Sequence, residues 1–475
     1  MSRGERLRAA ALLAALALGA AGGEARAAAA PGSTQEPAPT TALPAPDPDP
    51  GVLPLSLEDA VDRALSTHEA VLLAVAQADL AEAVLRQVRS AAMPRLDAEA
   101  TYTRNLERPV FFLEQDGQVR EIAVGSDNEH DAVLTLEQPL FDFRLPPALR
   151  AARLARAAAE AGIADSRTAV ALLARQAYYE ALLARELVGV RGRAIVQAED
   201  RLRQVGDFFE AGTAAEFDVL TARVEVDNLR PALIEAENRL RLARERLKRI
   251  VGVPFATEIE LTGDFAPPSP LPPLEAAVAE ALERRGDLAA QRLAVEAQEQ
   301  RVERDRRTAF PQLDLTAEYR GQASTEDVVP DELVPSSNAQ IRVTVPIYGG
   351  GEREAVVAQQ KALLDTERLL LRRLEDDARL EVQEALLALR AAEESLQATA
   401  ATVERAERAL DIARVRFANG LSTQLELDDA ELAVTEARSN VAAARYDYSV
   451  ARARLAAAMG GEAAMQEVDA LGARR

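Results

Sequence analysis

Two copies of one pattern make up most of this sequence. Three stretches of the first copy return 217 positions later: 57–61, 94–96 and Tyr102 match 274–278, 311–313 and Tyr319. Four later residues return after 208 positions: Phe209, Gly212, Leu247 and Gly252 match Phe417, Gly420, Leu455 and Gly460. Two constant spacings indicate a duplicated unit of about 200 residues that lost a short insertion. Two copies are too few for a solenoid, so the fold has to be sought inside the unit.

The composition favours an ordered and largely helical protein. Of the 475 residues, 48% are hydrophobic and 28% are charged, whereas only 4% are aromatic and Trp is absent. Ala, Leu, Glu and Arg dominate, as in long helices that pack closely against each other. The net charge of −21 argues against nucleic acid and anionic lipid as partners, because both would be repelled.

No motif in the sequence indicates catalysis. Cys is absent, which excludes disulfides, zinc-thiolate sites and a lipidated N-terminal Cys. His68 and His130 stand far apart and outside any metal-ligand spacing, and neither a P-loop nor a Gly-x-Ser-x-Gly motif occurs. We therefore expect no enzyme, no cofactor and no metal site. We expect His68 to be exposed to solvent at the start of a helix.

The N-terminus resembles a secretory signal. Three Arg residues precede the apolar run 9–21, and Ala25-Arg26-Ala27 provides a small-x-small cleavage site. We expect a signal peptide at 1–27, a stiff Pro-rich leader at 28–54 and a short tail at 461–475. No later stretch reaches 18 apolar residues, so any passage through a membrane has to be made by strands.

Each unit is predicted to contain a helix, two strands and a pair of long helices. The first repeat is assigned to 55–252 and the second to 272–460. The opening helices, 57–92 and 274–309, end before a Pro. Apolar and polar residues then alternate, which predicts two strands per repeat separated by a polar loop. The apolar positions are Leu96, Ala98, Ala100, Tyr102, Ala132, Leu134 and Leu136, and then Leu313, Leu315, Ala317, Tyr319, Ile341, Val343 and Val345.

The helices that follow carry a strict heptad pattern. The stretch 352–417 contains neither Pro nor Gly, and its helix would be about 100 Å long. Its large apolar residues fall every seven positions, at Val382, Leu389, Leu396, Val403, Leu410 and Phe417, and Ala or Thr lies between them. Leu427, Val434, Val441, Tyr448 and Leu455 continue this spacing in the partner helix. Such layers predict antiparallel coiled-coil packing with a left-handed supertwist.

Four amphipathic strands of about ten residues suit a tilted crossing of a bilayer. A soluble sheet covered by helices would look similar at this level. Four strands cannot close a barrel, and lipid does not tolerate an open edge, so several chains would have to contribute. Two chains give eight strands with a filled interior, whereas three give twelve and leave a lumen. The residues expected to face lipid are Leu96, Tyr102, Leu313, Leu315, Ile341 and Val343.

This organisation resembles the outer membrane efflux protein family, the TolC-like channel-tunnels. The likeness runs from Leu55 to Gly460 and includes the tip motifs Phe-x-x-Gly at 209–212 and 417–420. It implies a mainly α fold with a membrane β-barrel portion: a homotrimer with a twelve-stranded barrel and an α-barrel of long antiparallel coiled-coil helices. The implied function is the outer membrane exit duct of a tripartite efflux pump or a type I secretion system. The implied partners are a periplasmic adaptor, an inner-membrane transporter and outer membrane lipid.

A rival interpretation is a periplasmic coiled-coil structural or adaptor protein, which would need no alternating strands. In the family, acidic side chains ring the narrow periplasmic end. The matching residues here are Glu426, Asp429 and Asp218. A solvated acidic helix start explains a single carboxylate equally well.

The tips where family members meet adaptors match Gly212, Thr213, Gly420 and Leu421, although a turn between two helices also favours Gly. Some members hold their tips shut through a Tyr and an Arg, for which this chain has Phe417 and Ser422, so that lock is missing here.

Overall fold

The computed structural model describes residues 52–108, 110–115, 118–123, 125–330 and 332–461. The predicted signal peptide 1–27, the leader up to residue 51 and the tail from residue 462 lie outside the described residues. The described chain forms two compact units. Unit 1 comprises Ala83–Arg153 and Ala297–Leu364. Unit 2 comprises residues 52–82, Leu154–Glu296 and residues 365–461. Each unit is described by itself.

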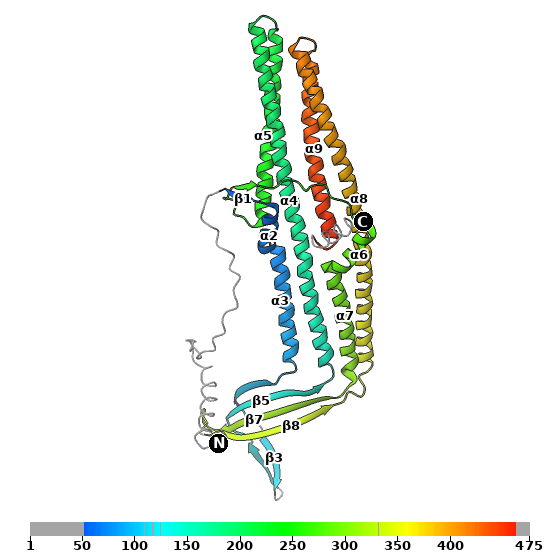
Figure 1. Cartoon of the computed structure of the whole chain (residues 1–475). Helices are drawn as coiled ribbons and strands as arrows, with labels where there is room; N and C mark the ends of the chain where they lie inside the picture. The colour runs from blue at the N-terminus through cyan, green and yellow to red at the C-terminus, as the bar shows by residue number, and fades with distance from the viewer. Residues whose placement is uncertain (1–51, 109, 116–117, 124, 331, 462–475) are drawn as a thin grey trace. The chain divides into compact units, whose positions relative to one another are not determined.

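Unit 1 contains an antiparallel sheet of four strands in the order β2-β5-β7-β8 (Figure 1). The strands are β2 (Arg95–Arg104), β5 (Asn128–Asp142), β7 (Gln312–Thr325) and β8 (Val334–Thr344). Each repeat supplies two of them, as the alternating pattern predicts. The register aligns Leu96 with Leu136, Leu136 with Ala317 and Ala317 with Ala339. Since side chains alternate along a strand, the predicted apolar positions share one face of the sheet, except Val345, which lies just after the end of β8.

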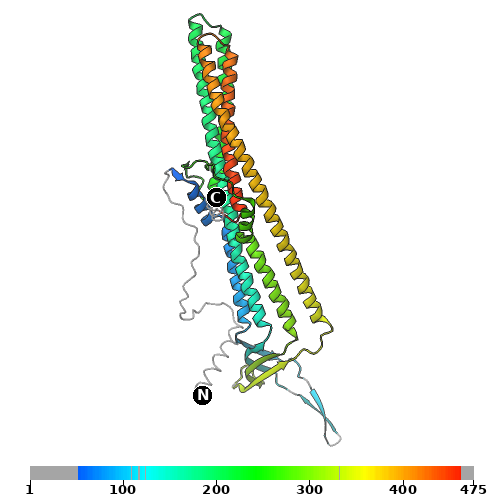
Figure 2. The same ribbon diagram turned by 45° about the vertical axis from the view of Figure 1, so that its right-hand side comes forward.

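The expected polar loop between the strands of the first repeat is wrong in part, because it contains a β-hairpin. Its strands are β3 (Val110–Gln115) and β4 (Gln118–Ala123), and Figure 2 shows the hairpin extending beyond the four-stranded sheet. Val110, Phe111 and Phe112 are strong strand formers, which explains the pairing. At the base of the hairpin Arg108 forms ion pairs with Asp127 (3.0 Å) and Glu326 (2.9 Å).

The predicted long helices are present in both repeats. The first repeat has α4 (Leu145–Glu210) and α5 (Glu216–Val251), and the second has α8 (Glu352–Ala418) and α9 (Gln424–Ala458). A short parallel pair of strands, β1 (Leu53–Leu55) and β6 (Ile259–Leu261), completes unit 2. Nowhere in the part of the chain covered by the structure is a helix both long and apolar enough for a membrane crossing.

The opening helix of each repeat was predicted to be continuous, and this is wrong. In the first repeat it breaks at His68 into α2 (Leu57–Thr67) and α3 (Glu69–Ser90). In the second repeat it breaks at Arg285 into α6 (Leu274–Arg284) and α7 (Gly286–Arg306). The short 3-10 helix η1 (Arg307–Ala309) follows α7. Both breaks have extended backbone angles and lie 217 positions apart, so the break belongs to the duplicated unit. His68 is half-buried rather than exposed, and its Nδ1 accepts a hydrogen bond from the Ala70 N–H (3.2 Å).

The predicted heptad seam of α8 and α9 forms two of the buried apolar clusters of unit 2. Val382 and Leu389 on α8 are buried with Tyr448 and Leu455 on α9. Nearer the tip, Leu410 packs with Leu427 and Val434. In the first repeat, the Tyr178 hydroxyl donates to the Leu55 carbonyl (3.1 Å) and accepts from the Gly263 N–H (2.9 Å). These two bonds connect α4 to the segments around the β1–β6 pair.

The close approach of α7 to α4 depends on a glycine. A Cβ on Gly286 would lie 2.7 Å from the Asp165 nitrogen and 2.8 Å from the Ala161 oxygen, both of which are backbone atoms. Gly286→Ala should therefore destabilise unit 2 by about 1–3 kcal/mol, since the helices have to move apart. Gly192→Ala, in open space on α4, should instead stabilise it by about 0.5–1 kcal/mol. The free energy of unfolding of both variants can be measured by urea titration with circular dichroism. Equal changes in the two variants would show that the close contact at Gly286 does not matter.

Candidate functional site

The two helical hairpins of unit 2 end in turns of the same geometry. Gly212 and Gly420 adopt positive φ angles of 73° and 68°. The N–H of Gly212 donates to the Phe209 carbonyl (2.9 Å), and that of Gly420 donates to the Phe417 carbonyl (2.9 Å). A Cβ at either Gly would meet no atom within 4 Å, so the backbone angle and not packing requires glycine. The adjacent Thr213 and Leu421 are exposed, and the turns thus present a free surface in the chain described.

The predicted acidic residues lie within the first two turns of the helices that leave the tips. Glu426 and Asp429, on α9, are both exposed. Glu426 forms an ion pair with Arg416 (3.5 Å), across the turn. On α5, Asp218 accepts a hydrogen bond from the Ala215 N–H (2.9 Å) and so caps its own helix. The structure brings Glu426 and Asp429 together on one helix, and it gives Asp218 a local role that the other two lack.

A buried charge cluster near the tips was not foreseen from the sequence. The side chain of Arg201 on α4 is only 3% exposed and forms ion pairs with Glu225, Asp428 and Glu431. Burial raises the pKa of Glu431, and the positive charges of Arg201 and Arg414 oppose this shift. The available signal was a difference between the repeats: the position 208 residues after Arg201 is Ala409.

Phe417 and Ser422 stand at the positions where some family members have the Tyr and the Arg that hold their tips shut. Phe417 packs against the apolar cluster of Leu410, Leu427 and Val434. The Ser422 hydroxyl has no hydrogen-bond partner among the residues that the structure describes. Neither residue therefore links the two hairpins through a polar contact.

The six strand residues predicted to face lipid share the apolar face of the sheet. Leu313 is paired with Val343 and Leu315 with Ile341, and Ile341 is 64% exposed. The opposite face carries the polar and charged side chains, including Asp97, Glu99, Glu137, Asp314, Thr316, Glu318 and Arg342.

Aromatic residues lie near both ends of the strands. Tyr102 contacts His130 at one end, with ring centroids 4.9 Å apart. Phe143 contacts both Phe141 (4.8 Å) and Phe310 (5.0 Å) at the other. An apolar band between aromatic girdles is typical of membrane strands.

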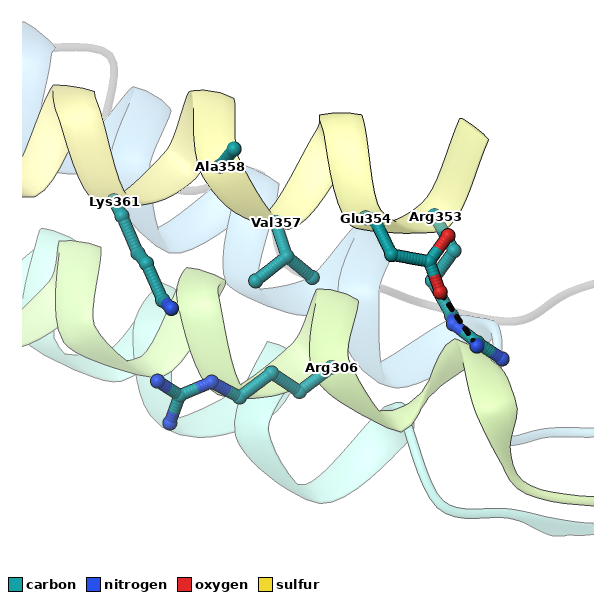
Figure 3. A pocket seen from close by; sticks show the side chains of 6 residues that line it. All are labelled: Arg306, Arg353, Glu354, Val357, Ala358 and Lys361. Atoms are coloured by element: carbon teal, nitrogen blue, oxygen red, sulfur yellow. Dashed lines mark hydrogen bonds and ion pairs between the residues drawn. The ribbon is translucent and has the colours of Figure 1, made fainter. Parts of the chain in front are cut away.

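A groove of about 330 Å³ lies between the ends of α7 and α8 in unit 1. Figure 3 shows the side chains of Lys361 and Val357 directed from α8 towards α7, on which Arg306 lies. Arg353 is paired with Glu354 (2.7 Å). The charged residues of the groove are exposed, and no nucleophile, general base or metal-ligating cluster accompanies them in the chain as described.

Comparison with known proteins identifies the class of protein. The family model described as "Outer membrane efflux protein" matches residues 60–253 and 277–461, and the chain belongs to this family. The alkaline protease secretion protein AprF of Pseudomonas aeruginosa is 27% identical over 388 residues, which cover 77% of this chain and 76% of that protein. The outer membrane protein TolC of Escherichia coli is 23% identical over 397 residues, covering 81% and 78%. The crystal structure of the Campylobacter jejuni CmeC outer membrane channel has the same fold, with a TM-score of 0.72 at 20% identity, and covers 87% of this chain and 88% of that chain.

The protein is therefore an outer membrane channel for efflux or secretion, with a large periplasmic part, and it is not an enzyme. Its family forms trimeric channels that work with efflux pumps. The fold class expected from the sequence is confirmed, and the rival interpretation as a periplasmic spacer or adaptor is excluded by the family.

Proposed function

We propose that this channel is the passive exit duct of an assembly in which a periplasmic adaptor docks on the hairpin tips and connects it to an inner-membrane transporter. The observation that carries the proposal is the exposed apolar surface at the tips. Phe217 is 74% exposed and Leu421 69% exposed, and Leu425 is also exposed. Phe217 lies at the tip of the first hairpin, and Leu421 and Leu425 lie at the tip of the second. Exposed apolar side chains at the ends of otherwise charged helical hairpins are typical of a protein-binding surface.

Leu421→Glu should weaken adaptor binding, because a charge replaces an apolar contact at the proposed interface. We expect a loss of at least ten-fold in the amount of adaptor that co-purifies with the channel, with trimer formation unchanged. Phe255→Glu is the matched control, since Phe255 is equally exposed and lies in the loop after α5, away from the tips. Equal losses in both variants would remove Leu421 from the interface.

In this proposal the cargo route passes a ring of carboxylates formed by Glu426 and Asp429 of three chains. Their exposure and their position in the first two turns of α9 support the assignment. Asp218 is a secondary member, because its carboxylate is already used in capping α5. The negative charge of the ring would attract cations and so make the channel selective for cations over anions.

The apolar sheet face would contact outer membrane lipid through Leu96, Tyr102, Leu313, Leu315, Ile341 and Val343.

The channel could serve two kinds of assembly, a secretion system or an efflux pump. A relative is named for alkaline protease secretion, and another is named as an outer membrane efflux protein. Deleting the gene separates the alternatives: loss of one secreted protein from the medium indicates secretion, and greater sensitivity to small toxic compounds indicates efflux.

A further inference from the structure

The groove between α7 and α8 in unit 1 carries more positive than negative charge. Among the described residues that line it, Arg306, Arg353 and Lys361 are basic and Glu354 is acidic. Glu354 is already paired with Arg353, at 2.7 Å. Figure 3 shows this pair at one end of the groove, and the charged tips of the Lys361 and Arg306 side chains nearer the other end. Two cations are therefore left to interact with whatever occupies the groove.

Neither of these two cations is firmly bound to a carboxylate. Lys361 is exposed and forms no ion pair or hydrogen bond with any residue that the structure describes. The Arg306 guanidinium is 3.8 Å from Glu303, whose carboxylate is closer to Arg307, at 2.9 Å. An ammonium binds phosphate as a compact point charge, and a guanidinium binds it through several N–H groups. A phosphate could thus approach both side chains without displacing a strong partner from either.

The groove lies just beyond the apolar face of the sheet. Phe141 is paired with Leu313 on that face, and Phe143 connects Phe141 to Phe310 through ring contacts of 4.8 and 5.0 Å. Arg306 precedes Phe310 by four positions, which is about one helical turn or roughly 6–8 Å along the axis. The headgroup layer on each side of a bilayer's hydrocarbon core is about 5–8 Å thick. Arg306 would therefore lie at the depth of the lipid headgroups if the apolar face contacts the hydrocarbon.

A phospholipid headgroup has the chemistry that this place requires. Its phosphate would accept hydrogen bonds from Lys361 and Arg306, and Val357 and Ala358 would contact the apolar part of the lipid. The volume of about 330 Å³ is that of a small-ligand site. A zwitterionic lipid would bring its own ammonium close to two cations, which favours an anionic headgroup such as phosphatidylglycerol. The net charge of −21 repels anions from the chain as a whole, so a local site is needed to hold one.

We infer that the groove of Arg306 and Lys361 binds the phosphate of an anionic phospholipid in the periplasmic leaflet of the outer membrane. The inference rests on the proposed function, in which the apolar sheet face contacts lipid. It adds one specific headgroup site to that general contact. A lipid held there fixes how deep the sheet sits in the bilayer, because the site ties the headgroup layer to a position one helical turn beyond Phe310.

The test measures how fast Lys361 reacts in the intact channel. The chain has only two Lys residues, and the other, Lys248, is buried and paired with Glu245 at 2.8 Å. An amine-reactive reagent should therefore modify Lys361, and mass spectrometry of its peptide gives the rate of modification. We expect phosphatidylglycerol, added to the detergent-solubilised trimer, to slow this reaction several-fold. Equal concentrations of phosphatidylcholine or of inorganic phosphate should leave the rate unchanged.

Two Arg→Gln variants distinguish a site from general attraction between charges. Arg306→Gln removes the second cation of the groove and leaves Lys361 in place, so the protection by phosphatidylglycerol should be lost. Arg301→Gln is the matched control, because Arg301 is also exposed on α7 but does not line the groove. Equal protection of Lys361 in the two variants would overturn the inference. Protection by inorganic phosphate would indicate a site for free anions, and equal protection by phosphatidylcholine would indicate mere coverage by lipid, so either result would also overturn it.

Native mass spectrometry gives a second measure that does not depend on the labelling reaction. The wild-type trimer should retain one phosphatidylglycerol per chain, and Lys361→Gln should lose this lipid. Assembly should survive the change, because Lys361 is exposed and has no partner among the described residues. Equal retention of lipid in Lys361→Gln and wild type would overturn the inference. A wild-type trimer that does not enter phospholipid vesicles would contradict the lipid contact of the proposed function. A trimer that enters them and yet shows neither protection nor retention would overturn the headgroup site alone.

Discussion

Ile341→Arg should prevent the protein from assembling in the outer membrane. Ile341 lies on the apolar face of β8, opposite Leu315 of β7, and is largely exposed in a single chain. An Arg on the lipid face of a membrane strand costs about 2–4 kcal/mol at the bilayer midplane. The cost would arise once in each of three chains. Gel electrophoresis of the outer membrane fraction measures the amount of heat-resistant trimer. We expect at least ten-fold less trimer in Ile341→Arg than in the wild type.

Gln340→Arg is the control at almost the same depth in the membrane. It is the neighbouring residue of the same strand, equally exposed, and its side chain points to the polar face beside Thr316. The added charge would face the lumen, where water solvates it, so we expect a normal amount of trimer. If both variants assembled equally well, or both failed, the assignment of the two faces would be wrong.

The sequence predicted the elements whose periodicity decides their structure. Alternation at 96–102 and 313–319 identified strands, and the observed register agrees with the requirement that the apolar positions share one face. The heptads of α8 and α9 likewise predicted their buried seam. In both cases the signal is repeated over many residues, so single exceptions do not remove it.

The breaks in the opening helices could not be predicted, because they depend on tertiary contacts. His68 and Arg285 are compatible with a helix, and no Pro stands beside them. At the second break the next residue, Gly286, lies so close to α4 that a Cβ would come within 2.8 Å of backbone atoms of Asp165 and Ala161. A contact between residues more than 100 positions apart leaves no mark in the local sequence. The hairpin after Arg108 was missed for a different reason: its two strands are only six residues long and contain both apolar and polar residues.

Some residues of the candidate site were likewise predicted from the sequence, and others were not. The tip glycines and the acidic helix starts were found because short motifs define them, and their backbone geometry agrees with the motif. Arg201 was missed because a charged residue in a charged coiled-coil helix is expected to be solvated. Only the packing of α5 and α9 around it makes it buried. A charge present in one repeat and absent from the other was the one sequence feature that set it apart.

Replacing both Glu426 and Asp429 by Ala should abolish the cation selectivity of the channel. In a trimer the two residues would bring six carboxylates to the narrow end, and crowded like charges attract cations and are bridged by multivalent ones. A single wild-type channel should therefore prefer cations to anions and be blocked by trivalent cations added on the periplasmic side. The double variant should lose at least ten-fold in affinity for the blocking ion.

Assembly should survive this change, since neither residue occupies the buried seam of Leu427 and Val434. The ion pair of Glu426 with Arg416 is exposed, so its loss should cost less than about 1 kcal/mol. Unchanged selectivity in the double variant would place the filter elsewhere and leave Glu426 and Asp429 as ordinary solvated residues at a helix start.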